Sequence, residues 1–214
     1  MFIVFEGLDG AGKTTQARKL LERLQAEGVK AEMVADPGTT PLGLAIRGIL
    51  LDSAMPVTPV AQMLLFSAAR AELAAHIRAA ITAGCVVICD RWVVSTLVYQ
   101  GVVNGINQEL ISDIFDGTVG LRPDLCVHLA IDVDTALTRV GSKRDRYESS
   151  SLEEWQLKHE AYEAFCRTRL AGAHRERLDA TQPVEQLHEN VYQLYRSLAA
   201  TIACRSLTSN TGSK

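Results

Sequence analysis

A glycine-rich stretch near the start of the chain has the residue types and spacing of a phosphate-binding loop. In GLDGAGKTT, residues 7–15, the pattern G-x-x-x-x-G-K-[ST] is satisfied. Glycines let backbone N–H groups turn toward a phosphate, and the start of a following helix adds partial positive charge. Lys13 would add a full positive charge, and Thr14 would offer a hydroxyl to Mg²⁺. We therefore expect a nucleoside triphosphate to contact Gly7, Leu8, Asp9, Gly10, Ala11, Gly12, Lys13, Thr14 and Thr15.

A carboxylate that suits the same ligand follows a later apolar run. Asp90 ends the run CVVICD, so it would lie at the carboxyl edge of a buried strand, where nucleotides bind in α/β folds. A carboxylate there can hold Mg²⁺ together with the hydroxyl of the loop, although it could also cap the next helix. The sequence predicts Thr14 and Asp90 as the magnesium site.

Basic side chains spread along the chain indicate what receives the phosphate. Transfer between two anions needs cations from several loops, and Arg47, Arg70, Arg91 and the basic segment 139–146 are candidates. The chain has no N-K-x-D motif, which a GTPase would carry, and an oligomeric motor would ordinarily be larger. A small-molecule kinase is the favoured class.

The elements that must position these residues alternate along the chain. Apolar runs predict strands at 2–6, 29–35, 85–90, 125–132 and 176–179. Helical patterns predict helices at 13–27, 42–51, 59–83, from about 152, and at 183–204. Strands that alternate with helices indicate a parallel α/β sheet with right-handed crossovers.

Length and composition limit the organisation and the partners. With 214 residues, 47% of them hydrophobic, we expect one domain over 1–204, an exposed mobile segment at about 139–151 and a disordered tail at 205–214. A net charge of −3 argues against a nucleic-acid partner. The scattered five cysteines argue against a metal cluster, and no secretory signal or membrane span is seen, so we expect a cytoplasmic protein.

Most of the chain resembles the bacterial thymidylate kinases, which are P-loop nucleoside monophosphate kinases. The segments that carry the resemblance are FEGLDGAGKTTQ (5–16), DPGTTPLGLAIR (36–47), LLFSAAR (64–70), DRWVVSTLVYQG (90–101), RPDL (122–125), DRYE (145–148) and DATQP (179–183). The resemblance implies a P-loop fold with a five-stranded parallel sheet, flanking helices and a basic lid. It also implies ATP and Mg²⁺ as cofactors, dTMP as the acceptor, and a homodimer formed through helices near 59–83 and 91–116.

The family pattern assigns an acceptor role to several positions. Asp9 would accept a hydrogen bond from the 3′-hydroxyl of the acceptor, and Arg47 and Arg91 would hold its monophosphate. Phe66 would stack on thymine, and Arg70 would donate to a base carbonyl.

Other positions complete the site that the resemblance implies. Ser95 and Gln100 would line the base pocket, Tyr99 would crowd the sugar 2′ position, and Arg139 would lie against adenine. The residues expected to act on the transferring phosphoryl group are Lys13, Arg91, Arg144 and Arg146.

Three alternative functions stay open at this point. The family's usual R-E-P-G-G-T appears here as ADPGTT (35–40), and Trp92 and Val98 replace a Tyr and an Ala. These differences keep dUMP or a 5-substituted analogue open as an alternative acceptor. Asp9 could serve as the general base of a deoxynucleoside kinase, since a neutral hydroxyl acceptor must lose its proton. A module that binds ATP without turnover would need none of the acceptor arginines.

Overall fold

A single parallel sheet carries the candidate site. The computed structural model describes residues 1–52, 54–141, 151–168 and 173–209. Its strands are β1 (Phe2–Glu6), β2 (Ala31–Ala35), β3 (Val86–Asp90), β4 (Leu125–Ala130) and β5 (His174–Asp179). They pair in the order β2-β3-β1-β4-β5, and every pair is parallel. The five-stranded parallel sheet is confirmed.

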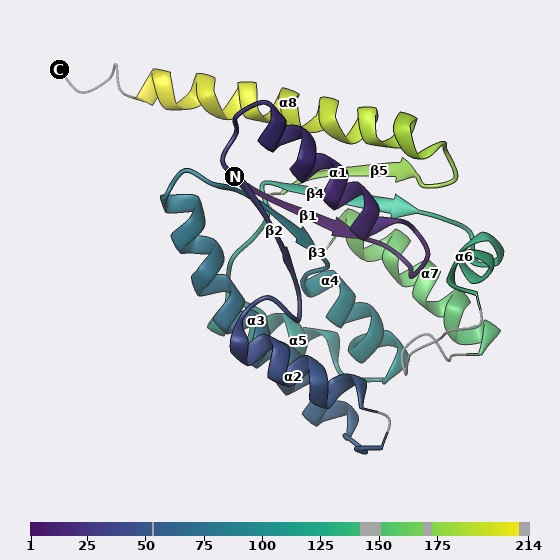
Figure 1. The fold of residues 1–214 in the computed structure, drawn as a ribbon. Helices are drawn as coiled ribbons and strands as arrows, with labels where there is room; N and C mark the ends of the chain where they lie inside the picture. Colours follow the sequence, from purple (N-terminus) through teal and green to yellow (C-terminus); the bar gives the residue numbers. More distant parts are fainter. Residues whose placement is uncertain (53, 142–150, 169–172, 210–214) are drawn as a thin grey trace.

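Helices cover both faces of this sheet. They are α1 (Lys13–Ala26), α2 (Pro41–Leu51), α3 (Pro59–Thr82), α4 (Val93–Thr96), a π-helix (Leu97–Val103), α5 (Gln108–Thr118), α6 (Val133–Val140), α7 (Leu152–Thr168) and α8 (Val184–Ser209). Helices α1 and α8 lie over one face, whereas α3, α4, α5 and α7 lie over the other, with α2 packed on α3 (Figure 1). Within the described ranges, no helix is long and apolar enough to cross a membrane.

Local sequence signals explain where several helices begin and end. Thr40 and Thr58 precede α2 and α3, and their hydroxyls accept from backbone N–H groups of the first turn at 3.0 and 3.4 Å. A Pro follows each of them at the first helical position, where its missing N–H costs nothing. Gly28 and Gly84, both with positive φ, follow α1 and α3. These stops agree with the predicted helix ends.

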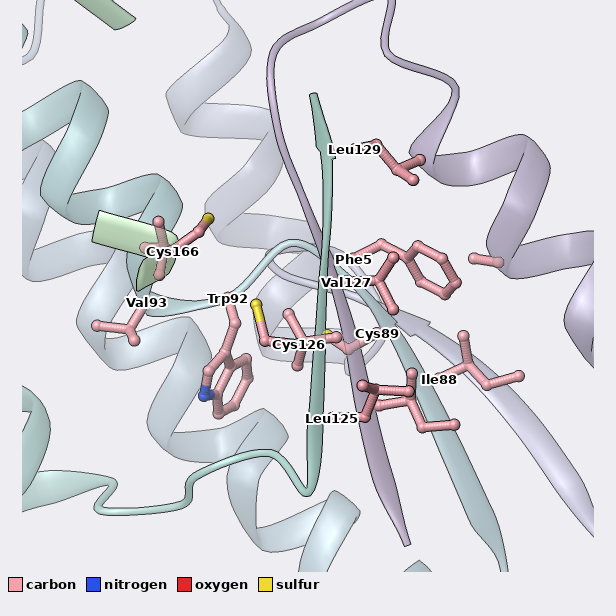
Figure 2. Close-up of a cluster of buried hydrophobic side chains, with 14 of the residues drawn as sticks. Phe5, Ile88, Cys89, Trp92, Val93, Leu125, Cys126, Val127, Leu129 and Cys166 are labelled. Atoms are coloured by element: carbon pink, nitrogen blue, oxygen red, sulfur yellow. The ribbon is translucent and has the colours of Figure 1, made fainter. Parts of the chain in front are cut away.

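The central strands are buried on both faces. Phe5, Ile88 and Val127 lie on one side of the strands in Figure 2, and Trp92 and Cys166 lie on the other. Their continuous apolar runs are what a parallel strand covered by helices on both faces requires. Cys85, Cys89, Cys126 and Cys166 are buried free thiols, as expected of cysteines that act as small hydrophobes.

Strands β2, β4 and β5 each differ from their predicted bounds by two residues at one end, and the helices differ further. Arg139 and Val140 form the end of α6, a helix that was not predicted, which begins where Asp132 accepts a hydrogen bond from the Thr135 N–H at 2.8 Å. The last helix continues to Ser209, past the expected boundary at 204. The segment after Asp90 is divided among α4, the π-helix and α5.

Two predicted segments lie outside the described residues. They are the part of the expected lid at 142–150, which contains Arg144 and Arg146, and the tail at 210–214.

The carboxyl end of β1 passes close to the neighbouring strand. Gly7 follows β1 with φ of 141°, and a Cβ atom at Gly7 would lie 2.5 Å from the carbonyl oxygen of Leu129. Real Cβ atoms do not come that close to a backbone oxygen. Gly7 therefore lets the phosphate-binding loop leave the sheet beside β4.

We predict that Gly7→Ala lowers the free energy of unfolding by about 3 kcal/mol or more, because positive φ and the contact with Leu129 both oppose a side chain. Gly28→Ala is the matched control, since Gly28 also has positive φ but nothing within 4 Å of its added Cβ. We expect that control to cost only about 1–2 kcal/mol. Urea denaturation measures both variants, and equal losses would show that the close approach at Gly7 is unimportant.

Candidate active site

One cavity of about 700 Å³ lies at the carboxyl ends of β1, β2 and β3. Most of the predicted site residues line it, namely Asp9, Gly10, Gly12, Lys13, Thr14, Thr15, Arg47, Phe66, Arg70, Asp90, Arg91, Ser95, Tyr99, Gln100 and Arg139. Gly7, Leu8 and Ala11 do not line the cavity, because they form the part of the loop that packs inward. The fold thus collects residues from six separate segments around one space.

The glycine-rich loop has a left-handed backbone at two glycines just before α1. Gly10 and Gly12 have φ of 81° and 87°. A Cβ atom added at Gly12 would have no neighbouring atom within 4 Å. The Lys13 ammonium is buried and donates to the Leu8 carbonyl at 2.7 Å. Burial and the nearby Arg91 lower the pKa of Lys13 to about 8, so the side chain is still mostly cationic at neutral pH.

Thr14 and Asp90 meet at one end of the cavity, as predicted. The Thr14 hydroxyl donates to Asp90 Oδ2 at 2.5 Å. The other carboxylate oxygen, Oδ1, is buried without a hydrogen-bond partner. A hydroxyl beside a carboxylate with a free oxygen suits a hard cation such as Mg²⁺. The described part of the chain has no cluster of three His, Cys, Asp or Glu residues, so such a cation would also need phosphate or water oxygens.

Asp9 is fully engaged by neighbouring side chains. Its Oδ1 accepts a hydrogen bond from Arg91 Nη2, and its Oδ2 accepts one from the Tyr99 hydroxyl at 2.5 Å. Burial alone would raise the pKa of Asp9, but the charges of Arg91 and Lys13 outweigh it and lower the pKa to about 2. Asp9 is therefore a carboxylate at any pH near neutral.

Arg91 lies at the centre of the polar wall of the cavity. Its φ of 73° is left-handed, which is uncommon for a residue with a side chain. Besides Asp9, its guanidinium donates to the Gly7 carbonyl at 3.3 Å, the Ser95 hydroxyl at 3.2 Å and the Tyr162 hydroxyl at 2.7 Å.

Glu6 lies behind this wall, and sequence reasoning did not identify it. Glu6 ends β1, is completely buried, and accepts hydrogen bonds from the Trp92 and Ser95 N–H groups and from the Ser95 hydroxyl. Burial raises the pKa of Glu6 to about 7 even though these hydrogen bonds favour the carboxylate. Its signal in the sequence is an acidic residue at the end of an otherwise apolar strand, MFIVFE. Tyr162, on α7, was also missed.

Arg70 also lines the cavity and is held by two side chains. It is buried, its Nε donates to Asp36 Oδ2 at 2.5 Å, and its Nη2 donates to the Thr96 hydroxyl at 2.7 Å. Gln100 Nε2 and Asp36 Oδ1 are buried nearby without hydrogen-bond partners. Tyr99 and Gln100 belong to the π-helix, a rare geometry that often occurs at functional sites.

An apolar wall adjoins Arg70. Phe66 packs against a small buried cluster of Ile46, Leu50 and Ala69 and also lines the cavity. The sequence predicted Phe66 at this site, but it did not identify the other apolar lining residues, Met33, Leu44, Leu50 and Leu51.

Two other predicted arginines that line the cavity contact backbone carbonyls. Arg47 Nη1 donates to the Pro37 carbonyl at 3.0 Å, in the loop that follows β2. Arg139 Nη1 donates to the Ala180 carbonyl at 3.0 Å and to the Gly10 carbonyl at 3.4 Å. Arg139 therefore lies beside the glycine-rich loop, at the end of α6.

Known proteins are similar to this chain over most of its length. The family model described as thymidylate kinase matches residues 5–191. The chain is 41% identical over 199 residues to the thymidylate kinase of Symbiobacterium thermophilum, covering 91% of this chain and 92% of that protein. It is 38% identical over 210 residues to that of Ectopseudomonas mendocina, covering 96% and 98%. It is 38% identical over 207 residues to that of Pelodictyon phaeoclathratiforme, covering 91% and 94%.

The family model spans the glycine-rich loop, the segment 90–101 and the helices between them. The chain therefore belongs to the thymidylate kinase family.

Proposed function

We propose that this chain transfers the γ-phosphoryl group of ATP to dTMP, giving ADP and dTDP. One observation supports this reaction above all others. A single cavity is lined by the glycine-rich loop, by Thr14 and Asp90, which would hold Mg²⁺, and by Arg70 and an aromatic side chain, Phe66. A nucleotide donor and a nucleotide acceptor can therefore share one space, which in-line transfer requires.

The donor end of the cavity would hold ATP. Backbone N–H groups of residues 7–15 and the ammonium of Lys13 would bind its phosphates, and Arg139 would lie beside the nucleotide, at the loop. Thr14 and Asp90 would hold Mg²⁺. When bound, Mg²⁺ neutralises charge on the phosphate oxygens. The chain's own contribution is to place fixed positive charge where negative charge develops.

The acceptor end would bind the monophosphate without a general base. A phosphate monoester has a second pKa near 6, so at pH 7 most of it is already an anionic nucleophile. Arg47 and Arg91 would hold this phosphate. Asp9 would be a weak base, because its pKa is about 2 and both of its oxygens already accept hydrogen bonds. That argues against a nucleoside kinase, whose hydroxyl acceptor must lose a proton.

The base would lie against the apolar wall. Phe66 would stack on thymine, while Arg70, held by Asp36 and Thr96, would direct its remaining N–H groups at a base carbonyl. Gln100 Nε2, which is buried without a partner, would donate to another acceptor on the base. Ser95 and Tyr99 line the same region, and Tyr99 would crowd a sugar 2′ substituent. Asp9 is close enough to Tyr99 to contact the sugar as well.

The remaining proposals concern assembly and setting. We propose one kinase domain over 1–204, with a basic lid at about 139–151 whose Arg144 and Arg146 reach the transferring group. A homodimer would form through α3 and the segment after β3, and exposed Val60, Leu64 and Leu110 lie on α3 and α5. We place the reaction in the cytoplasm, where ATP and nucleoside monophosphates are available.

We predict that Arg91→Ala lowers kcat by about 10²–10³-fold, because it removes a fixed cation from the point where negative charge develops. ADP release coupled to a spectrophotometric signal measures the rate, and circular dichroism checks folding. Arg122→Ala is the control, since Arg122 pairs with Asp116 at 2.7 Å outside the cavity lining. Near-normal turnover of the folded Arg91 variant would refute its assigned role.

We predict that Asp90→Asn raises the Mg²⁺ concentration needed for half-maximal rate by at least ~10-fold, because an amide oxygen binds a hard cation more weakly than a carboxylate. A titration of initial rate against Mg²⁺ at saturating nucleotides measures this shift. Asp116→Asn, on the exposed surface of α5, should leave the titration unchanged. An unaltered Mg²⁺ dependence in Asp90→Asn would exclude Asp90 from the magnesium site.

We predict that kcat/KM for dTMP exceeds that for dUMP by about 10-fold or more, because burying one methyl group in an apolar pocket is worth about 1–3 kcal/mol. Rates with dTMP, dUMP and thymidine, measured in the same ADP-release assay, give the comparison. Equal or faster turnover of dUMP would favour the altered-acceptor alternative, and turnover of thymidine alone would indicate a nucleoside kinase. ATP binding with no turnover of any acceptor would indicate a binding module.

A further inference from the structure

Glu6 connects the end of β1 to the segment that follows β3. Its Oε1 accepts a hydrogen bond from the Trp92 N–H at 2.8 Å and a longer one from the Ser95 N–H at 3.3 Å. Its Oε2 accepts one from the Ser95 hydroxyl at 2.7 Å. Trp92 is the N-cap residue of α4, but its side chain makes no capping hydrogen bond. The carboxylate of Glu6, at the end of β1, takes that role instead.

When Glu6 is a carboxylate, the hydrogen bonds beyond Ser95 have one consistent direction. The Ser95 hydroxyl has a single hydrogen, which is directed to Glu6. The Tyr162 hydroxyl, 2.9 Å from Ser95 Oγ, must therefore donate to it. A guanidinium can only donate, so Arg91 donates to the Tyr162 oxygen at 2.7 Å. A continuous chain of donors thus runs from Arg91 through Tyr162 and Ser95 to the buried carboxylate.

The backbone of Arg91 also depends on this carboxylate. A left-handed φ costs a residue with a side chain about 1–2 kcal/mol, so it persists only where surrounding contacts enforce it. Arg91 N–H donates to the Phe5 carbonyl at 3.0 Å, and the next N–H, of Trp92, donates to Glu6. Adjacent residues of β1 therefore hold both sides of the turn that aims Arg91 into the cavity.

We infer that Glu6 is a positioning residue, which fixes the direction of the Arg91 guanidinium through Trp92, Ser95 and Tyr162. The inference rests on the proposed function, in which Arg91 contacts the acceptor phosphate. Glu6 and Tyr162 do not line the cavity, so neither touches a nucleotide bound in it. Their effect on the reaction is indirect.

The experiment compares Glu6→Gln and Tyr162→Phe, each almost isosteric, in the ATP and dTMP reaction. Glutamine presents an N–H₂ group where the carboxylate accepts hydrogen bonds, so one donor loses its acceptor. We expect kcat to fall by about 10–100-fold, because small misplacements of a catalytic group have effects of that size. The affinity for ATP, measured by calorimetry, should stay within a factor of about two, since the phosphate loop keeps its contacts.

Tyr162→Phe removes one oxygen and should lower kcat in the same direction. Because both residues act along one chain of hydrogen bonds, the double variant should lose no more activity than Glu6→Gln alone. If Glu6→Gln does not fold, the kcat of Tyr162→Phe still tests whether this chain of hydrogen bonds positions Arg91. A folded Tyr162→Phe variant with unchanged kcat would overturn the inference, and so would additive losses in the double variant.

Asp124→Asn is the matched control for a purely structural role. Asp124 Oδ2 accepts from the Phe2 N–H at 2.7 Å, so it anchors the opposite end of the same strand, far from the cavity lining. This variant should change stability but not kcat. An equal loss of kcat in Asp124→Asn, or a loss of ATP affinity in Glu6→Gln, would mean that Glu6 only supports the fold. Wild-type protein that does not phosphorylate dTMP would instead refute the proposed function, and this inference with it.

Discussion

Parallel pairing of β1 with β3 is the constraint on which the site depends. Phe5 lies opposite Asp90 in the register, so the glycine-rich loop that follows β1 and the Asp90-Arg91 pair that ends β3 emerge side by side. Thr14 therefore reaches Asp90, and Arg91 reaches Asp9 and the Gly7 carbonyl. A shift of one residue would turn every side chain of the strand to the opposite face and separate these groups.

Charge balance keeps this cavity wall in place before any nucleotide binds. Arg91 and Lys13 are close to each other, and their repulsion is offset because Asp9 lies between them as a carboxylate. Arg70 and Asp36 form a second buried pair in the cavity lining. Buried pairs of this kind add little to stability, but removing one partner leaves an expensive unpaired charge. The arrangement therefore favours pre-organised cations, whose value for catalysis is that they need not move when the reaction occurs.

Short-range patterns accounted for much of the fold. The run MFIVFE followed by GLDGAGKTT predicted β1, the loop and α1, because the spacing of glycines and of apolar residues is a local property. The helix α6 was missed because residues 133–138 were assigned to no element, and its last two residues were placed in the basic segment. The π-helix was missed for a different reason, since its hydrogen bonds depend on packing against α3, α5 and α7 rather than on composition.

By itself, the sequence determined the kind of chemistry. A phosphate loop, a carboxylate after a buried strand and scattered arginines are identifiable by type and spacing, and the family follows from the segments that contain them. Only the tertiary structure decided which atoms meet. In the structure, the two carboxylate oxygens of Asp9 accept hydrogen bonds from Arg91 and Tyr99, and Arg70 donates to Asp36. Glu6 and Tyr162 lie behind Arg91. Most of these contacts join residues that are more than 60 positions apart, so strand register, helix packing and side-chain rotamers fix them, and no local pattern records those.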